Sequence, residues 1–493
     1  ASGAASGSRN ALPRPRRLPG AAVRLLGGLL GGLLWTASPC LQASDLVFPV
    51  WSYVLPSGYG SDSIRGLALD SDGVLSAAGV LRNSADKADG AWLGRFGAPA
   101  WTHLVDLGPV VAGVRDEVND RFHEVAVDSQ NNGIVTGTKS GAYWAGDGYH
   151  CAALVQKFSP AGALLWERIQ SYGPWSSSYG VCADATDNVY VAGAVFGNWG
   201  DQEGQWAVWK YDSAGTLQAG FPLYYDYATG SGAYEYQDIA FDIAVDTAGG
   251  FLVVGRRGVA KGNLDWHVRR YDASRTLVWQ DTHSGAAAAV DDAYRAVADS
   301  EGNFVVAGYT AKASGDYDWL VIKYQGSDGQ RLWTRTFESA AGRSEACYGI
   351  DVDGLGNALV GGSELGEDGK AHWRLEHLAK ADGQLLAAQV WASAQSETLY
   401  AVAYRDGQIA LAGCQSNGTD NDQYIVTGLL GVDLSINPST VDFGSVTTGA
   451  AGERQVAITN TSGQTVTLGA IAISDPLATP FVIVADGCSG RTL

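Results

Sequence analysis

DDAYRAVADSEGNFVVAGYT, which begins at Asp291, is followed by DYDWLVIKY from Asp316 and by DGQRLWTRTF from Asp328. Apolar and polar residues alternate in these segments, which is the pattern of a half-buried β-strand. A tight turn at 299–303 divides the first segment. The Asp side chain caps amides of such a turn, while Gly or Asn supplies the left-handed residue that a hairpin needs. The stretch therefore predicts four short strands joined by tight turns.

The same unit recurs along the chain. The glycine that ends its second strand is found at Gly79, Gly137, Gly193, Gly255, Gly308, Gly362 and Gly413. Successive copies are 51 to 62 residues apart. The Asp-containing turn recurs at 70–73, 128–133, 184–188, 246–250, 299–303 and 353–357. Seven copies at such a period indicate a repeat architecture.

Tryptophans mark the third and fourth strands of the unit. In the third strand a Trp is followed four residues later by a basic residue, in the pairs Trp206/Lys210, Trp266/Arg270, Trp319/Lys323 and Trp373/His377. The fourth strand carries Trp101, Trp166, Trp279 and Trp333. A four-stranded unit cannot bury both of its faces alone. We therefore expect these indoles to pack between neighbouring units.

Stacking of such units around an axis buries both faces of each sheet, and this arrangement is a β-propeller. The sequence predicts an all-β fold, with a seven-bladed β-propeller of four-stranded blades over residues 44–431. The seventh unit ends near Thr427 after only three strands, while an orphan strand, Phe48 to Tyr53, precedes the first unit. We expect this N-terminal strand to complete the last blade.

Two segments carry a resemblance to a known family, DSEGNFVVAGYT at 299–310 and DATDNVYVAGAV at 184–195. They resemble the SBBP repeats of secreted bacterial β-propeller proteins, and the resemblance extends over residues 44–431. It implies an architecture rather than an activity. The spacings Gly162/Trp166 and Gly329/Trp333 also look like the tryptophan-docking segments of quinoprotein propellers. The cofactor lid of those enzymes is formed by two adjacent Cys residues, and no two Cys are adjacent in this sequence. We therefore expect no cofactor.

The pattern changes at Val432, where short alternating strands with Gly, Asn and Ser turns predict an immunoglobulin-like β-sandwich. Residues 432–493 resemble the Hydin-like, or choice-of-anchor D, modules of bacterial surface proteins. The resemblance rests on Asn437-Pro438, Phe443–Val446, Asn460-Thr461 and Cys488. Those modules continue beyond the region that matches Cys488, so we expect a truncated immunoglobulin-like module here.

The first 43 residues are typical of a signal peptide. Four Arg between Arg14 and Arg24 precede an apolar stretch, Leu25 to Trp35, and cleavage after Ala43 fits the small residue wanted there. A lipoprotein attachment at Cys40 is the alternative. No later segment approaches 18 apolar residues, so no transmembrane span is expected in the mature chain. We expect a bacterial protein that is secreted, periplasmic or on the cell surface.

The charge balance limits the partners. The chain has 33 Lys and Arg against 52 Asp and Glu, and residues 1–43 hold five of the bases and no acid. An acidic body repels phosphate backbones, which argues against nucleic-acid binding. Cations and neutral glycans are compatible ligands. Cys151, Cys182, Cys347 and Cys414 lie at unmatched repeat positions, as buried thiols or in one of three disulfide connectivities.

An acidic residue recurs at the start of the first strand of the unit. It lies 17 residues before the repeated glycine in Asp62, Asp120, Asp238, Asp291 and Glu345, and 16 before it in Glu397; Ser176 interrupts the series. The first strand is innermost in a propeller, so these carboxylates should ring one mouth of the channel. They predict a site for calcium or a cationic ligand, with capping of nearby amides as the alternative.

Aromatic residues concentrate in the variable loops at the same face, formed by the B–C and D–A connections. The candidate glycan-binding residues are Tyr143, Trp144, Trp175, Tyr179, Trp199, Tyr225 and Tyr234. Flat rings on a rigid frame offer sugar C–H groups an apolar platform. The alternative is that the long loops fold these rings inward as small clusters.

The sequence contains no nucleophile elbow, no HExxH and no phosphate-binding loop. We therefore predict a monomeric, non-catalytic binding or structural propeller that takes a glycan, a cell-surface component or a cation on its B–C/D–A loop face. The alternative is an extracellular polysaccharide hydrolase or lyase that uses the carboxylates at the channel mouth.

Overall fold

The structure is a computed structural model. It describes residues 47–54, 62–82, 89–97, 99–105, 120–140, 151–172, 175–196, 204–226, 238–260, 262–338, 344–416, 421–430, 434–437 and 457–460. These residues form two compact units, which we describe separately. The first comprises the described residues of 53–406 and 410–426, and the second those of 47–52, 407–409 and 427–460. All regular elements in these ranges are strands, as expected of an all-β chain.

Four sheets are four-stranded and antiparallel, and each follows chain order. The first sheet consists of β2(Ser63–Leu69), β3(Leu75–Arg82), β4(Asp89–Phe96) and β5(Trp101–Val105), and the second of β14(Ile239–Val245), β15(Phe251–Ala260), β16(Asn263–Tyr271) and β17(Leu277–His283). The third consists of β18(Asp292–Ala298), β19(Phe304–Ala311), β20(Tyr317–Tyr324) and β21(Arg331–Phe337). The fourth consists of β22(Ala346–Val352), β23(Ala358–Leu365), β24(Ala371–Leu378) and β25(Leu385–Trp391).

Eight further strands form one larger sheet with two antiparallel halves. The halves are β6(Arg121–Val127), β7(Gly133–Ser140), β8(Cys151–Phe158) and β9(Leu164–Gln170), and β10(Trp175–Ala183), β11(Val189–Phe196), β12(Gly204–Tyr211) and β13(Leu223–Tyr225). They meet where Trp175 of β10 pairs with Cys151 of β8 in parallel. Each half has the strand order of the separate four-stranded sheets.

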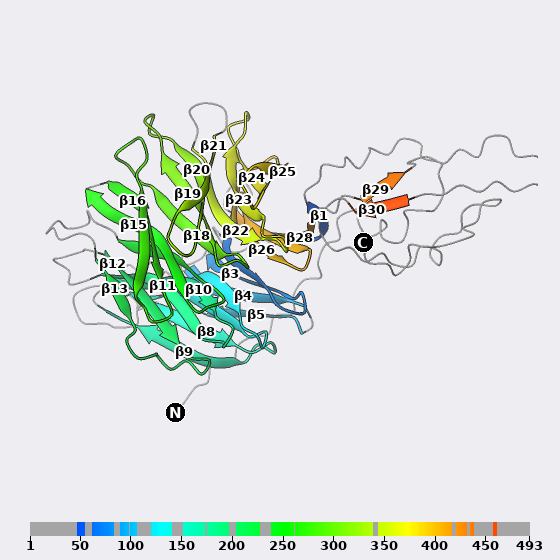
Figure 1. Ribbon diagram of the computed structural model, residues 1–493. Coiled ribbons are helices and arrows are strands. Elements are labelled where there is room, and N and C mark those ends of the chain that lie inside the picture. Colours follow the sequence, from blue (N-terminus) through cyan, green and yellow to red (C-terminus); the bar gives the residue numbers. More distant parts are fainter. Residues whose placement is uncertain are drawn as a thin grey trace, which may run out of the picture. The chain divides into compact units, whose positions relative to one another are not determined.

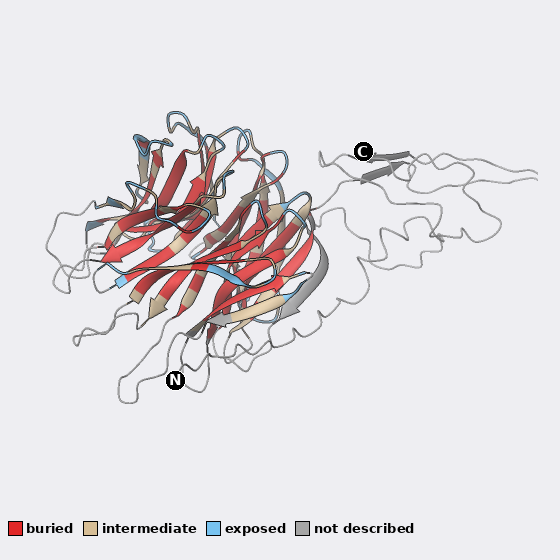
Figure 2. Ribbon diagram, turned by 90° about the horizontal axis from the view of Figure 1, so that it is seen from below, coloured by how far each residue is buried: buried red, intermediate tan, exposed pale blue. Residues whose placement is uncertain are grey.

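The first strands of the sheets surround a common centre, as Figure 1 shows. Contacts run from β2 to β6, β10, β14, β18, β22 and β26(Glu397–Arg405), and from β26 back to β2. The second and third strands of the sheets are buried along most of their length, whereas the fourth strands β9, β17, β21 and β25 carry exposed residues (Figure 2). The first unit is therefore a β-propeller-like assembly of sheets around a central channel.

The remaining four-stranded sheet has the order β1(Val47–Val54), β28(Asn421–Leu430), β27(Gln408–Ser416) and β26. The expected pairing of the N-terminal strand with the last strand of the final repeat is thus confirmed. Within the first unit, Asp62 N donates to the carbonyl oxygen of Asn421 at 2.9 Å, and Gln423 Nε2 donates to the carbonyl oxygen of Val80 at 3.1 Å. These bonds link the last repeat directly to the first.

A β-bulge interrupts the first strand opposite the repeated glycine. In β6 the register shifts between Phe122, which faces Gly137, and Glu124, so His123 is the extra residue. A Cβ on Gly137 would lie 1.9 Å from the carbonyl oxygen of Arg121. The equivalent glycines meet the same obstacle, at 1.8 to 2.2 Å. The glycine recurs because any side chain would displace the bulged strand.

The repeated tryptophans pack between sheets, as predicted. Trp206, Trp266, Trp319 and Trp373 are buried. The fourth-strand indoles donate through Nε1 to a carbonyl oxygen in a turn of the next repeat, in the pairs Trp101–Pro160, Trp166–Ser213, Trp279–Gly326 and Trp333–Lys380, at 2.9 to 3.1 Å. The sheets are therefore held side by side by buried rings and by directed hydrogen bonds.

The basic residue that follows the third-strand Trp has a definite partner, the Asp of the first turn in the same sheet. Lys323 Nζ lies 2.8 Å from Asp299 Oδ2, and Lys157, at the same position of a third strand that has Ala153 in place of the Trp, has its Nζ 2.7 Å from Asp128 Oδ2, both in buried pairs. Hydrogen bonds from these lysines and from turn amides lower the pKa of both carboxyl groups, against the effect of burial. The Asp-rich turns are thus tied to the third strand.

The second unit is described only in part. β29(Leu434–Asn437) and β30(Ala457–Asn460) pair in antiparallel fashion. The rest of the expected immunoglobulin-like module and the expected signal peptide at 1–43 lie outside the described residues. In the part of the chain that the structure describes, there is no helix long and apolar enough to cross a membrane.

The bulge predicts a contrast between two glycines of the same strand. Gly137→Ala should lower the melting temperature, because the new methyl group meets a backbone oxygen; such overpacking costs about 1–3 kcal/mol. Gly133→Ala, at the start of β7, should change it little, since nothing lies within 4 Å of its Cβ position. Thermal unfolding of both variants measures the difference, and equal melting temperatures would refute the role of the bulge.

Candidate functional site

The acidic residues predicted to ring the channel mouth are all buried: Asp62, Asp120, Asp238, Asp291, Glu345 and Glu397 are at most 3% exposed. Asp120, Asp238 and Asp291 each accept a hydrogen bond from the amide 20 residues later, at 2.7 to 2.8 Å. Glu397 accepts one from the side chain of Gln415. These four carboxylates bind the end of the second strand of their own sheet, which is the capping alternative.

A metal site at these acids stays a prediction. Among the residues that the structure describes, no group of three or more His, Cys, Asp or Glu side chains is arranged to hold a metal ion. Cys151, Cys182, Cys347 and Cys414 are free thiols, and burial raises the pKa of each. The open question of disulfide pairing is therefore resolved in favour of unpaired thiols.

Ser176, which interrupts the acidic series, has its own task. Its hydroxyl donates to the carbonyl oxygen of Tyr172 at 3.0 Å and accepts from the Tyr172 amide at 3.1 Å. These two bonds join Tyr172 to the start of β10. Tyr172 is 53% exposed, and its ring lies 5.4 Å from that of Tyr224, which is 46% exposed. The serine thus fixes the backbone that carries an exposed aromatic pair.

The predicted glycan-binding residues are found in different surroundings. Trp175 opens β10, is 37% exposed and stacks on Phe196 at 4.7 Å. Tyr225 is half-buried in β13, with the guanidinium of Arg269 3.7 Å from its ring centre. Both residues lie in strands, because β10 and β13 extend further than the sequence indicated. Four others, Tyr143, Trp144, Trp199 and Tyr234, lie outside the described residues.

Sequence reasoning missed Tyr172 and Tyr224. Tyr224 alternates with Tyr225 along β13, so one ring faces solvent while the other packs inward. The alternation of side-chain direction along a strand was the sequence signal that could have identified Tyr224 as exposed. Together with Trp175, the two tyrosines lie where β10 begins and β13 ends, on the B–C/D–A face. We call Tyr172, Trp175 and Tyr224 the aromatic platform.

The seventh candidate, Tyr179, belongs to a second group of residues, at the bulge of each first strand. We call this group the channel ring: Arg65, His123, Tyr179, Phe241, Tyr294, Tyr348 and Tyr400. Its members precede the repeated glycine by 14 residues, or by 13 in the last copy. From His123 to Tyr400 their aromatic centres are 4.8 to 5.8 Å apart in sequence order, and the Arg65 guanidinium lies 4.9 Å from the Tyr400 ring.

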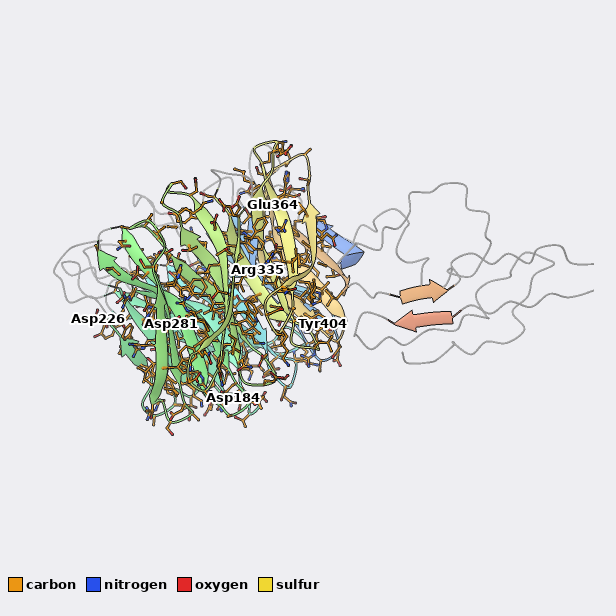
Figure 3. All side chains as sticks on the ribbon, turned by 45° about the horizontal axis from the view of Figure 1, so that its top comes forward. Asp184, Asp226, Asp281, Arg335, Glu364 and Tyr404 are labelled. Carbon is orange, nitrogen blue, oxygen red and sulfur yellow. The ribbon has the colours of Figure 1, made fainter. Side chains whose placement is uncertain are left out.

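A larger cavity of about 380 Å³ lies among the same first strands, toward their C-terminal ends. Glu124, Asp242, Arg295 and Asp351 line it, as does Tyr404, which Figure 3 labels. Arg295 of β18 reaches across the channel: its Nη2 lies 2.6 Å from Glu124 Oε2 of β6 and donates to the carbonyl oxygen of Arg65 at 3.1 Å. This arginine links opposite sides of the assembly.

The cavity carboxyl groups have altered acidity. Burial raises the pKa of Glu124 to about 7, although the charge of Arg295 acts in the opposite direction. Burial also raises the pKa of Asp242, again against Arg295, and brings that of Asp351 to about 6. Asp351 accepts hydrogen bonds from the amides of Val352 and Tyr404, which oppose this shift. Glu124 and Asp351 therefore have pKa values closer to neutral pH than ordinary carboxyl groups have.

Charged clusters away from the channel are internally paired. Arg335 binds Glu376, and Arg374 bridges Glu376 and Glu364, at 2.7 to 2.8 Å. Figure 3 labels Arg335 and Glu364 in this network. Since each charge has an opposite charge beside it, the network is explained by structure alone. The aromatic platform and the channel remain as the candidate sites.

Comparisons with known proteins assign no family. No family model matches the chain, and no curated protein matches it in sequence. Among solved structures it is similar to an ulvan lyase of polysaccharide lyase family PL25 bound to -[GlcA(1-4)Rha3S]-, at 10% identity and a TM-score of 0.45, over 76% of this chain and 96% of that chain. A second structure of a PL25 ulvan lyase gives 10% identity and a TM-score of 0.44, with the same coverage.

A protein of unknown function from Dyadobacter fermentans is similar over 78% of this chain and 100% of that chain, at 9% identity and a TM-score of 0.40. Because these TM-scores are below 0.5, none of the three likenesses assigns an activity to this chain.

The raised pKa of Glu124 predicts a pH-dependent stability. Its pKa in the fold, about 7, exceeds the ordinary 4.5, so its contribution is fully present below about pH 4.5 and is lost as the pH rises through 7. Glu124→Gln stays neutral and should lack this loss. The melting temperature of the variant, relative to the parent, should therefore increase between pH 4.5 and 7.5.

Glu301→Gln is the matched control for loss of one negative charge, because the Glu301 side chain is 56% exposed. A difference between Glu124→Gln and the parent that does not vary with pH would contradict the assignment.

Proposed function

We propose that the chain is a seven-bladed β-propeller of the SBBP kind, exported by residues 1–43 and acting as a non-catalytic binding protein outside the cytoplasm. Its ligand is a neutral or weakly charged glycan, held on the aromatic platform of the B–C/D–A face. The seven-blade count rests on the cyclic contacts of the seven first strands and on the placement of β1 beside β28. The observation that carries the binding function is the exposure of Tyr172, Trp175 and Tyr224.

The platform has features that sugar binding needs. Exposed rings of this size are costly in water, and the adjacent rings of Tyr172 and Tyr224 favour a partner that covers them. Ser176 fixes the backbone at Tyr172, and Phe196 supports Trp175 from behind, so little order is lost on binding. Polar groups stand beside the rings: Gln205 Nε2 donates to Asp226 Oδ2 at 3.1 Å on the exposed surface. Figure 3 labels Asp226 at the edge of the sheets.

The polysaccharide hydrolase or lyase is kept as a second candidate, on the strength of Glu124. A carboxyl group with a pKa near 7 beside a second carboxylate suits general acid catalysis. These groups lie in the channel cavity rather than at the mouth, where the carboxylates act as amide caps. Against this candidate, Glu124 is already paired with Arg295, and Asp242 accepts amide hydrogen bonds from Ile243 and Ala296.

The platform predicts a loss of glycan retention on mutation. The triple variant Tyr172→Ala, Trp175→Ala and Tyr224→Ala should lose the retardation that a neutral polysaccharide gel imposes on the parent in affinity electrophoresis. The melting temperature should fall only slightly, because these rings are already exposed. Removing three stacking rings should weaken binding by about tenfold or more.

The control variant carries Leu332→Ala and Leu386→Ala, which remove exposed apolar side chains, 41% and 54% exposed, away from the platform. It should be retained like the parent. If the parent migrates unhindered through every neutral polysaccharide tested, or if the triple variant unfolds early, the rings serve packing. Release of reducing ends or unsaturated products from the same glycans would instead favour the hydrolase or lyase.

A further inference from the structure

Arg65 differs from the other arginines that face the interior. Arg95 pairs with Asp70, and Arg295 pairs with Glu124, both at 2.6 Å. Arg65 forms no ion pair with any residue that the structure describes; its contact is with the face of the Tyr400 ring, and its buried Nε has no acceptor. Arg65 is half-buried, and a charged group that is partly withdrawn from water without an opposite charge costs free energy. Arg65 therefore holds a positive charge that the described fold leaves uncompensated.

The cavity beside Arg65 is lined by hydrogen-bond donors, and the nearby carboxylate of Glu124 is paired with Arg295. A small cavity of about 20 Å³ opens inside the channel ring. On the same measure one water needs about 10–15 Å³, so the space admits one small polar group. Its polar lining consists of Arg65, His123, Tyr179, Tyr294, Arg295 and Tyr400. Two arginines, a histidine and three tyrosines thus line the space, with no acidic residue among its lining residues.

The protonation states fit the same picture. Burial, and the positive charges of Arg65, Arg121 and Arg295, lower the pKa of His123 well below its usual value, so the ring is neutral and keeps one N–H. Burial raises the pKa of Tyr179 and brings that of Tyr400 to about 12, so both hydroxyl groups keep their protons. At neutral pH these groups can donate hydrogen bonds to an anion.

We propose that the channel ring is a binding site for a single carboxylate group, with Arg65 as its counter-ion. The planar guanidinium matches a carboxylate in two parallel hydrogen bonds, and tyrosine hydroxyls complete the shell. The space accepts a carboxylate and excludes a sugar ring or a peptide unit. The group is therefore either a free small acid or the tip of a larger molecule that enters along the channel axis. The site is distinct from the aromatic platform and does not depend on it.

The test uses the full chain and two carboxylates, sodium acetate and sodium glucuronate, with sodium chloride at equal ionic strength as the reference. We expect at least one carboxylate to raise the melting temperature of the parent above the chloride value. Stabilisation by acetate identifies a free small acid as sufficient. Stabilisation by glucuronate alone identifies a carboxylate carried on a sugar. No stabilisation by either overturns the proposal.

Two variants of Arg65 keep the test decisive. Arg65→Gln should bind at least about tenfold more weakly by calorimetry, since it loses a charged hydrogen-bonding partner. It should be no less stable than the parent without ligand, because it removes an uncompensated charge. Arg65→Lys keeps the charge but not the planar fork, so it should bind with intermediate strength. Arg331→Gln, at an arginine that pairs with Asp281 in the outer strands, should bind like the parent.

Equal binding by the parent and Arg65→Gln would show that the carboxylate sits elsewhere and would overturn the proposal. Should Arg65→Gln fail to fold, Arg65→Lys decides: unchanged affinity in that variant also overturns the bidentate site.

Discussion

The close approach of each repeated glycine to the bulged strand beside it is the constraint on which the rest of the structure depends. A Cβ on Gly255 or Gly308 would lie 1.9 Å from a backbone oxygen of the first strand. Without a side chain there, the first strand can take an extra residue and turn that residue toward the channel. The repeat therefore fixes two things together: the packing of strands within a sheet, and the direction of one side chain per sheet. The channel ring is the product of that coupling.

The channel ring and the Arg295–Glu124 ion pair have different structural roles inside the channel. The ring lines the axis with aromatic side chains in mutual contact, whereas the ion pair joins β18 to β6 across the channel. The larger cavity lies on the side of the first turns, where backbone and small apolar side chains form most of the wall. The aromatic platform lies on the opposite, B–C/D–A face. The larger cavity and the aromatic platform thus lie toward opposite ends of the first strands.

A feature of the structure could be predicted from the sequence where its position accepts few residue types. Glycines, tryptophans and turn aspartates were recognised because each has one permissible residue type, and the strand pairing around β1 followed from them. The channel ring was not recognised, since its side chains all point toward the channel but differ in residue type: Arg65, His123, Phe241 and four tyrosines. The acidic series was recognised, but its role was left open between a cation site and amide capping, because a periodic carboxylate looks the same in sequence whether it faces solvent or caps the amide of Gly258. Tyr224 was not recognised, because the sequence alone does not show which of the adjacent residues Tyr224 and Tyr225 faces solvent.

The channel is better suited to ligand binding than to catalysis, because its carboxyl groups already have partners whereas Arg65 has no ion-pair partner among the described residues. Glu124 and Asp242 have partners on hand, so a proton transfer would first have to break an ion pair or an amide hydrogen bond. Arg65 has no such partner among the described residues, and donors surround it. An acidic chain would be expected to repel anions, yet that repulsion is screened over about 8–10 Å at ordinary salt, whereas a guanidinium at contact distance is not. The local arrangement of charge can therefore select a ligand that the net charge of the chain disfavours.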